Sequence, residues 1–133
     1  MVMNIEVIIP NRVISNLKAD EIVLPGLTGQ IGVLSGHASL ITALDTGLLR
    51  IKFDQKWTPI ILCGGLAEIK SDKITVLAND VEELVNIELS EATQKLEDIA
   101  LSIENAETSK DRLDASIELK KAMARLEAIN YLS

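Results

Sequence analysis

The residue types that most often carry chemistry are sparse in this chain, which has one histidine, His37, and one cysteine, Cys63. A zinc site needs about four nitrogen, sulfur or carboxylate ligands, and this pair falls short of the usual set. The apolar neighbours of Cys63 in the sequence offer no cation that would favour a reactive thiolate. We interpret Cys63 as a buried thiol that packs like a small hydrophobic residue, and His37 as a hydrogen-bonded structural or interface histidine. No catalytic residue, metal ligand or cofactor is predicted.

Glycine is concentrated around His37, in the stretch of residues 28–42. That stretch holds three of the seven glycines of the chain, Gly29, Gly32 and Gly36. Their spacing matches neither of the glycine patterns that bind nucleotide phosphates, and no lysine follows them, so a phosphate loop is not predicted. The apolar residues between the glycines instead predict a short strand with a sharp bend at each end. His37 falls at the second bend.

Alternation of apolar and polar residues marks short strands in the N-terminal two thirds of the chain. Besides the glycine-rich strand, they are predicted at residues 2–9, 12–15, 21–24, 49–53, 57–63, 66–70 and 73–78. The polar residues 16–20 are expected to separate two strands, Pro25-Gly26 to form a turn, and Ser71-Asp72 to form a two-residue hairpin loop. Turn signals at roughly 8- to 12-residue spacing favour a sandwich or a barrel.

The apolar spacing changes to that of an α-helix after residue 80. One apolar stripe runs through Ala92, Leu96, Ile99, Ile103 and Ala106, and a second through Ala115, Leu119, Ala122, Leu126 and Ile129. Ser90 is predicted to cap the first helix, and Thr108 with Asp111 to form a capping box at the second. The chain should therefore reverse near residues 107–110 and form an antiparallel helical hairpin.

The change of period near Asn86 predicts two domains and an α+β fold. Residues 1–86 are expected to form a β domain of about eight to ten short strands, and residues 87–133 the helical hairpin. Whether the hairpin lies against the β domain or extends away from it is left open by the sequence.

Charge and composition restrict the partners of the chain. Twenty acidic and thirteen basic residues give a net charge of −7, which disfavours direct binding to nucleic acid or anionic lipid, so protein partners are expected. The longest apolar run, residues 59–67, is far shorter than the roughly 20 residues needed to span a bilayer, and any membrane association should be indirect. The N-terminus enters a strand pattern by Ile5, so no targeting peptide is predicted.

Motifs across the chain resemble the epsilon subunit of F-type ATP synthases. The pattern G-x-x-G-V-L-x-x-H-A spans residues 29–38, Gly-Leu-Leu-Arg-Ile occupies residues 47–51, and Gly64-Gly65 precedes another apolar strand. Two departures are Ser39 and Leu66, where the family usually has proline and phenylalanine. The resemblance implies a β-sandwich followed by two helices, with no active site of its own.

The resemblance also implies a role in the central stalk of a proton-translocating ATP synthase. The β domain would couple the gamma subunit to the membrane c-ring, and the hairpin would restrain ATP hydrolysis. By position in the motif, Gln30 and His37 are expected contacts with the gamma subunit and the c-ring. Lys120, Lys121 and Arg125 are expected to face an acidic segment of the catalytic beta subunit, in the alpha/beta part of the enzyme.

Bacterial members that bind ATP carry the motif I/L-D-x-x-R-A on the second helix, and residues 117–122 keep its frame, that is, its first and last residues and its spacing. Glu118 replaces the usual aspartate and Lys121 the usual arginine, so the planar two-pronged donor is lost, which argues against regulatory ATP binding.

Short phrases such as Gly-Gln-Ile-Gly-Val-Leu and Arg-Leu-Glu-Ala-Ile-Asn resemble plastid and cyanobacterial members most. The expected location is therefore the stromal side of the chloroplast thylakoid membrane, with a bacterial membrane as the alternative. Two functions from other classes are a free-standing β-sandwich adaptor and a small hydrolase. The adaptor would have no affinity for ATP synthase subunits, and the hydrolase would lose turnover when Cys63 or His37 is changed.

Overall fold

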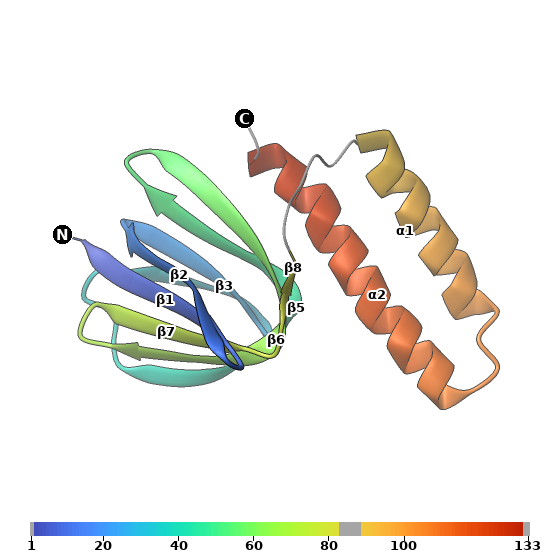
Figure 1. The fold of residues 1–133 in the computed structure, drawn as a ribbon, viewed down its shortest axis with the longest axis horizontal. Coiled ribbons are helices and arrows are strands. Elements are labelled where there is room, and N and C mark those ends of the chain that lie inside the picture. The colour runs from blue at the N-terminus through green and yellow to red at the C-terminus, as the bar shows by residue number, and fades with distance from the viewer. Residues whose placement is uncertain (1, 83–88, 132–133) are drawn as a thin grey trace.

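The computed structural model describes residues 2–82 and 89–131, which form a β-sandwich followed by two packed helices (Figure 1). The strands are β1 Met3–Ile9, β2 Arg12–Ala19, β3 Glu21–Gly26, β4 Gly29–Leu34, β5 Leu40–Phe53, β6 Lys56–Lys70, β7 Lys73–Ala78 and β8 Val81–Glu82. The helices are α1 Leu89–Glu104 and α2 Ser109–Ala128, and a short 3-10 turn, η1 Ile129–Tyr131, follows. The expected α+β fold is confirmed. The predicted domain boundary at Asn86 lies outside the described residues.

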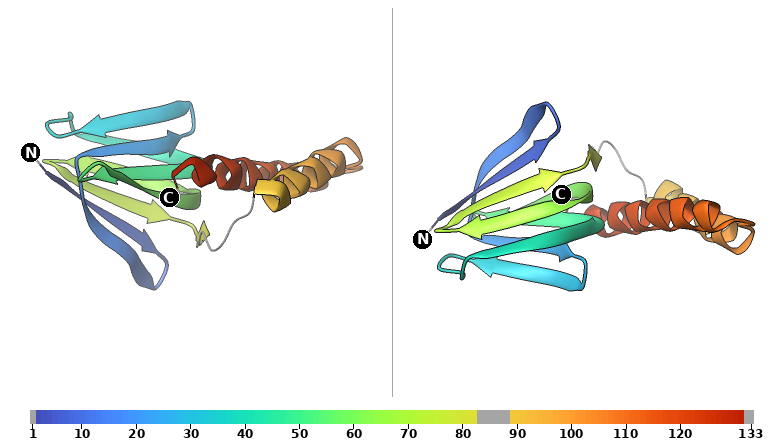
Figure 2. Two further views of the ribbon diagram at one scale, coloured as in Figure 1. Left: turned by 90° about the horizontal axis from the view of Figure 1, so that it is seen from above. Right: turned by 90° about the horizontal axis from the view of Figure 1, so that it is seen from below.

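The strands form one hydrogen-bonded sheet that folds over on itself. Its order is β2-β1-β7-β6-β5-β3-β4, with β8 pairing on β6, and all pairs are antiparallel except β1 with β7. The long strands β5 and β6 pair with each other along almost their whole length. Because strands twist, this long central pair carries the sheet from one layer of the sandwich to the other (Figure 2).

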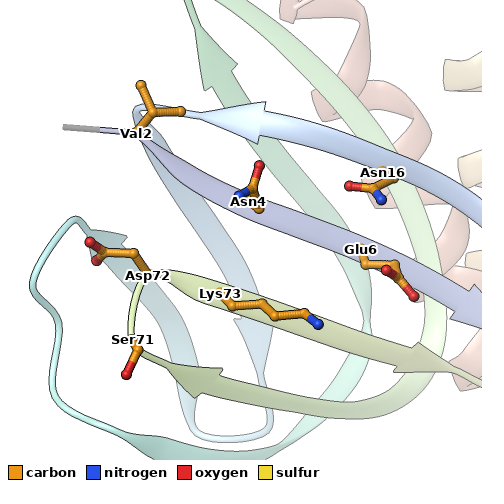
Figure 3. Close-up of a pocket in the computed structure, with 7 residues that line it drawn as sticks. All are labelled: Val2, Asn4, Glu6, Asn16, Ser71, Asp72 and Lys73. Carbon is orange, nitrogen blue, oxygen red and sulfur yellow. The ribbon is translucent and has the colours of Figure 1, made fainter.

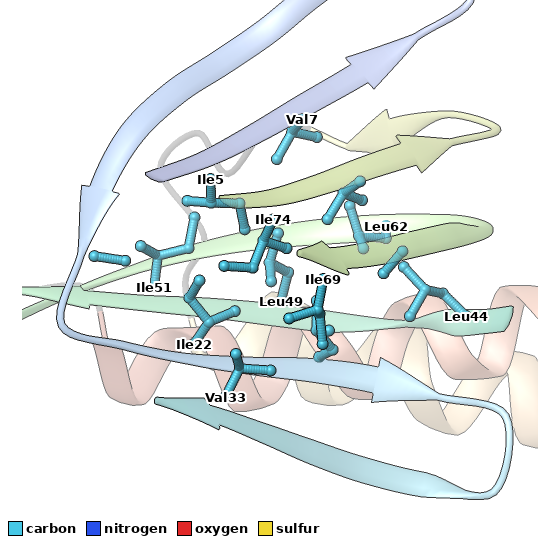
Figure 4. Close-up of a cluster of buried hydrophobic side chains, with 14 of the residues drawn as sticks. Ile5, Val7, Ile22, Val33, Leu44, Leu49, Ile51, Leu62, Ile69 and Ile74 are labelled. Carbon is cyan, nitrogen blue, oxygen red and sulfur yellow. The ribbon is translucent and has the colours of Figure 1, made fainter. Parts of the chain in front are cut away.

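The core lies between the two layers and is built from aliphatic side chains (Figure 4). Ile5, Ile22, Leu49, Leu62 and Ile74 are all fully buried there. Each buried aliphatic side chain contributes about 1.5–3 kcal/mol relative to exposure, so this cluster is the main source of stability of the sandwich.

Strand pairing outweighs a local sequence signal in three places. The polar residues 16–20 do not separate two strands as predicted, because β2 runs on to Ala19 along its pairing with β1. Pro25-Gly26 is not the turn; both residues belong to β3, and the chain turns at residues 27–28. The two strands predicted at 57–63 and 66–70 form one strand, β6. An edge strand such as β2 forms backbone hydrogen bonds with one neighbouring strand only, and it tolerates polar side chains. The polar residues 16–20 were therefore a poor guide to where β2 ends.

Gly65 shows why β6 needs glycine at its midpoint. Its φ is 146°, and an added Cβ would lie 2.2 Å from the carbonyl oxygen of Leu77 on β7. Only glycine allows so close an approach of two backbones. The Ser71-Asp72 loop is confirmed as the two-residue connection of β6 and β7, with φ values of 51° and 62°. Positive φ at both positions is the geometry of a tight hairpin turn.

The helical hairpin follows the predicted stripes. Every residue of both stripes is buried or half-buried, and α1 packs on α2. The Thr108 hydroxyl accepts a hydrogen bond of 3.0 Å from the backbone N–H of Asp111, which confirms the second cap. The first cap is wrong by at least a residue, because Ser90 lies inside α1, which already includes Leu89. Neither helix is long and apolar enough to cross a membrane within the described residues.

Candidate interaction surfaces

The His37 loop, residues 35–39, joins β4 to β5 at the end of the sandwich where the chain begins (Figure 2). The backbone N–H of His37 donates to the carbonyl of Leu34 at 3.1 Å, and its Nδ1 lies 2.7 Å from the carbonyl oxygen of Ala38. Gly36 has a φ of 85°, which creates the bend predicted at this point. His37 is therefore half-buried and held by local hydrogen bonds at a bend.

Gln30 does not lie beside His37. It stands at the start of β4, and His37 follows the end of the same strand, so the six-residue strand separates them by roughly 20 Å. The amide oxygen of Gln30 accepts a hydrogen bond of 3.1 Å from Arg50 on β5. Arg50 also donates to the hydroxyl of Tyr131 at the end of the hairpin. The two predicted contact residues thus belong to opposite ends of the sandwich, and Gln30 is on the end that meets the helices.

The hairpin lies against the sandwich, which answers the question left open by the sequence (Figure 1). A second apolar cluster forms the contact and consists of Leu48, Ile61, Ala124 and Ala128, with Tyr131 packed against it. We call these residues the hairpin interface. The sequence carried a signal for it, because the adjacent apolar pairs Leu48-Leu49 and Ile61-Leu62 are typical of strands covered on both faces.

The three predicted basic residues of α2 all have acidic partners within the chain. Lys120 forms a salt bridge of 3.0 Å with Asp45 of β5, and Arg125 is hydrogen-bonded through two nitrogens to Glu82 of β8. The Glu82 hydrogen bond raises the pKa of Arg125 above its ordinary value. In this conformation Lys120 and Arg125 tie α2 to the sandwich. Sequence reasoning placed the bases correctly on α2 but gave no sign of their acidic partners.

Lys121 pairs within α2, with Glu118 at 3.3 Å, so the two residues of the nucleotide-binding frame contact each other. Burial acts to lower the pKa of Lys121, but the neighbouring Cys63, Glu118 and Glu82 together raise it. Cys63 is half-buried, not fully buried as predicted, because it faces the edge of the hairpin instead of the main core. Burial nevertheless raises the pKa of its thiol, which disfavours the reactive thiolate.

An exposed apolar surface on the sandwich escaped sequence reasoning. Leu66 on β6 pairs directly with Leu77 on β7, which pairs with Ile8 on β1. Leu66 is 41% exposed, Leu77 48%, and Ile41 on β5 65%. We call Ile8, Ile41, Leu66 and Leu77 the outer-face patch. Alternation alone gave no sign of it, because these side chains share a surface only once the strands are paired.

Next to this patch, the same sheet face is polar. An open hollow near the N-terminus is lined by side chains of β1, β2 and the β6–β7 turn, among them Asn4, Asn16 and Asp72 (Figure 3). Within the described residues, no group of three or more His, Cys, Asp or Glu side chains could hold a metal ion.

Comparison with known proteins identifies the family of this fold. A family model described as "ATP synthase, Delta/Epsilon chain, beta-sandwich domain" matches residues 2–84. The chloroplastic ATP synthase epsilon chain of Phaeodactylum tricornutum is 74% identical over 133 residues, which is 100% of both chains.

Two solved structures share the fold. A chain of the Euglena gracilis mitochondrial ATP synthase, in an OSCP/F1/c-ring structure, aligns with a TM-score of 0.79 and 19% identity, covering 96% of this chain and 81% of that one. A chain of the Tetrahymena thermophila mitochondrial ATP synthase, in a central stalk/c-ring structure, aligns with a TM-score of 0.59 and 11% identity, covering 95% of each. The similarity to chloroplastic epsilon chains over the full length of this chain argues against the adaptor and hydrolase alternatives. This chain belongs to the epsilon subunits of F-type ATP synthases, as a non-catalytic central-stalk component of the chloroplast enzyme.

Proposed function

We propose that this chain couples the gamma subunit to the c-ring through its sandwich, and restrains ATP hydrolysis through its hairpin. The division of labour follows the predicted domains, residues 1–86 for coupling and residues 87–133 for restraint. The chain would lie on the stromal side of the thylakoid membrane, attached to it through the complex.

The observation that carries the coupling role is the outer-face patch. Three large apolar side chains of adjacent strands are 41–65% exposed, and the hairpin packs elsewhere, on Leu48 and Ile61. An exposed apolar cluster on a soluble surface favours burial against another protein. We infer that the gamma subunit is the partner that covers this surface in the central stalk.

The two ends of β4 support separate contacts. The His37 loop lies at the end of the sandwich away from the hairpin (Figure 2), and its Ser35 and Gly36 are hydrogen-bonded to Asp72, which lines the polar hollow of Figure 3. We propose that this end meets the c-ring. Gln30 lies at the other end, beside Arg50 and the hairpin, where a contact with the gamma subunit would also touch the helices. The solved structures of related fold come from assemblies that include a c-ring, which supports a c-ring as one of the partners of this chain.

The restraining role rests on the bases of α2. Lys120, Lys121 and Arg125 are long cationic side chains near the sandwich end of one helix, and an acidic segment of the catalytic beta subunit could bind them. In the conformation seen here they are paired with acids of this chain, so binding the beta subunit would require those pairs to open.

A single substitution tests the coupling role. Leu77→Glu places a charge at the centre of the outer-face patch without touching the core, because Leu77 points outward. We expect the full-length variant to bind ATP synthase depleted of its epsilon subunit at least tenfold more weakly, as removal of a central apolar contact typically costs 1–2 kcal/mol or more.

The matched control is Leu113→Glu, which puts the same charge on a 62% exposed leucine of α2 far from the patch. It should bind like the parent chain. Parent-like binding of Leu77→Glu would contradict the proposed gamma contact.

A further inference from the structure

We infer that Asp72 is a positioning residue for the His37 loop, and that it acts on partner binding only through that loop. The inference rests on the proposed function, in which the end of the sandwich bearing His37 meets the rotor.

The contacts of Asp72 are the reason. Its carboxylate accepts hydrogen bonds from the Ser35 hydroxyl at 3.1 Å and from the Gly36 backbone N–H at 2.8 Å. Its own backbone carbonyl accepts one from the N–H of Asn4 at 2.9 Å. One residue therefore joins three segments that are far apart in the sequence: the start of β1, the β6–β7 turn and the β4–β5 loop. Figure 3 shows the side chain extending from the turn toward that loop.

The loop needs such a support. Gly36 has no side chain and a φ of 85°, and an added Cβ there would meet nothing within 4 Å, so no neighbouring group packs against this side of the bend. Among the described residues, the two hydrogen bonds to Asp72 are the only side-chain hydrogen bonds that tie residues 35–36 to a distant part of the chain. The Gly36 N–H bond to Asp72 fixes the peptide plane between Ser35 and Gly36, directly before His37, and so adds to the local hydrogen bonds that hold His37.

The conformation of the β6–β7 turn also suits Asp72 to holding the His37 loop. It lies at φ 62°, a conformation that aspartate, asparagine and glycine tolerate better than other residues. A hydrogen bond to a charged acceptor is about twice as strong as one between neutral groups, so the carboxylate makes a firm anchor for a partly exposed loop.

The test uses Asp72→Gly, which keeps the positive φ and removes the whole carboxylate. The matched control is Ser71→Gly, in the same turn at φ 51° and with no hydrogen bond to the loop among the described residues. Full-length variants are titrated against chloroplast ATP synthase depleted of epsilon. We expect Asp72→Gly to bind about three- to tenfold more weakly and Ser71→Gly to bind like the parent.

Two further variants separate positioning from general stability. Asp72→Asn should restore binding to within about twofold, because its amide oxygen can accept from Gly36 and its NH2 can donate to the Ser35 hydroxyl. Hydrogen exchange at the Gly36 and His37 amides should be faster in Asp72→Gly than in Ser71→Gly, while the two variants unfold at similar temperatures.

A double-mutant cycle with His37→Ala decides the question. If Asp72 acts through the loop, the double variant should bind no more weakly than the weaker single variant. If the losses of binding affinity in the two single variants multiply in the double variant, the positioning role is overturned. The same holds if Asp72→Gly binds like the parent while His37→Ala binds weakly. Parent-like binding of both single variants would overturn the proposed interface at this end, and the inference with it.

Discussion

At the scale of single residues, Arg50 links the sandwich to the hairpin. It donates to Gln30 and to the Tyr131 hydroxyl, and its guanidinium lies 5.3 Å from the Tyr131 ring centre and 5.9 Å from that of Trp57. Trp57 and Tyr131 themselves meet edge to face at 5.7 Å. The Nε atom of Arg50 is buried without a hydrogen-bond partner in the described structure, and the ring contacts add to the two hydrogen bonds that hold the guanidinium in place.

Replacing Arg50 with lysine should loosen the hairpin, since lysine cannot keep both hydrogen bonds and the stacked geometry. Cys63 offers the measurement, because Lys121 and Glu118 of α2 lie close enough to influence the pKa of its thiol. We expect alkylation of Cys63 to become roughly three- to tenfold faster, as the loss of one hydrogen bond and one cation–π contact is worth about 1 kcal/mol or slightly more. Lys52→Ala, which removes a cation 5.7 Å from the Trp57 ring but leaves Tyr131 untouched, is the control. Equal rates in both variants would argue against an Arg50 link.

At the scale of elements, α2 is apolar on two faces. The predicted stripe packs on α1, and Ala124 and Ala128 pack on β5 and β6. Small residues at this second face let the helix approach the sheet closely. The interface buries few large side chains, whereas the described part of the sandwich core has sixteen buried residues, so most of the stability of the sandwich does not depend on the hairpin.

A chain that ends at residue 86 should therefore keep the β domain and its binding to the gamma subunit. In an assembled enzyme, this truncation should raise ATP hydrolysis, because the helices proposed to restrain it are gone, while ATP synthesis persists at least partly. Hydrolysis assays on enzyme reconstituted with the full or the truncated chain provide the measurement. Unchanged hydrolysis would indicate that the hairpin is a structural brace.

At the scale of the whole molecule, the same basic residues serve two opposed contacts. Lys120 and Arg125 bind Asp45 and Glu82 when the hairpin lies on the sandwich, and they are the proposed contacts with the beta subunit when it does not. The acids of the sandwich therefore compete with the beta subunit for these side chains.

This competition predicts changes of opposite sign. Neutralising Lys120, Lys121 and Arg125 together should relieve inhibition of hydrolysis by less than the truncation does, because each surface ion pair is worth about 0–1 kcal/mol. Changing Asp45→Asn and Glu82→Gln should instead strengthen inhibition, because the bases are released. The inhibition itself should weaken as ionic strength rises, given a Debye length of about 8 Å near physiological salt. If both sets of substitutions changed hydrolysis in the same direction, competition would be wrong.

The sequence by itself determined the local elements of this protein and its family. Helical stripes, the Thr108 cap, the Ser71-Asp72 turn and the bend before His37 follow from the preferences of neighbouring residues, and they are confirmed. The motif of Gly29 to Ala38, together with Gly-Leu-Leu-Arg-Ile at residues 47–51 and Gly64-Gly65, indicated the epsilon family, because glycines and one histidine at fixed spacing are informative without coordinates.

The tertiary structure alone decided which distant side chains meet. Asp72 reaches Ser35 across 37 positions of sequence, and Lys120 reaches Asp45 across 75, so no local pattern could reveal either contact. The end of β2 and the position of the turn after β3 were also misjudged. Pairing with a neighbouring strand outweighs the polarity of residues 16–20 and the turn preference of Pro25-Gly26. Periodicity describes how one segment faces its surroundings, whereas strand order and helix docking determine what those surroundings are.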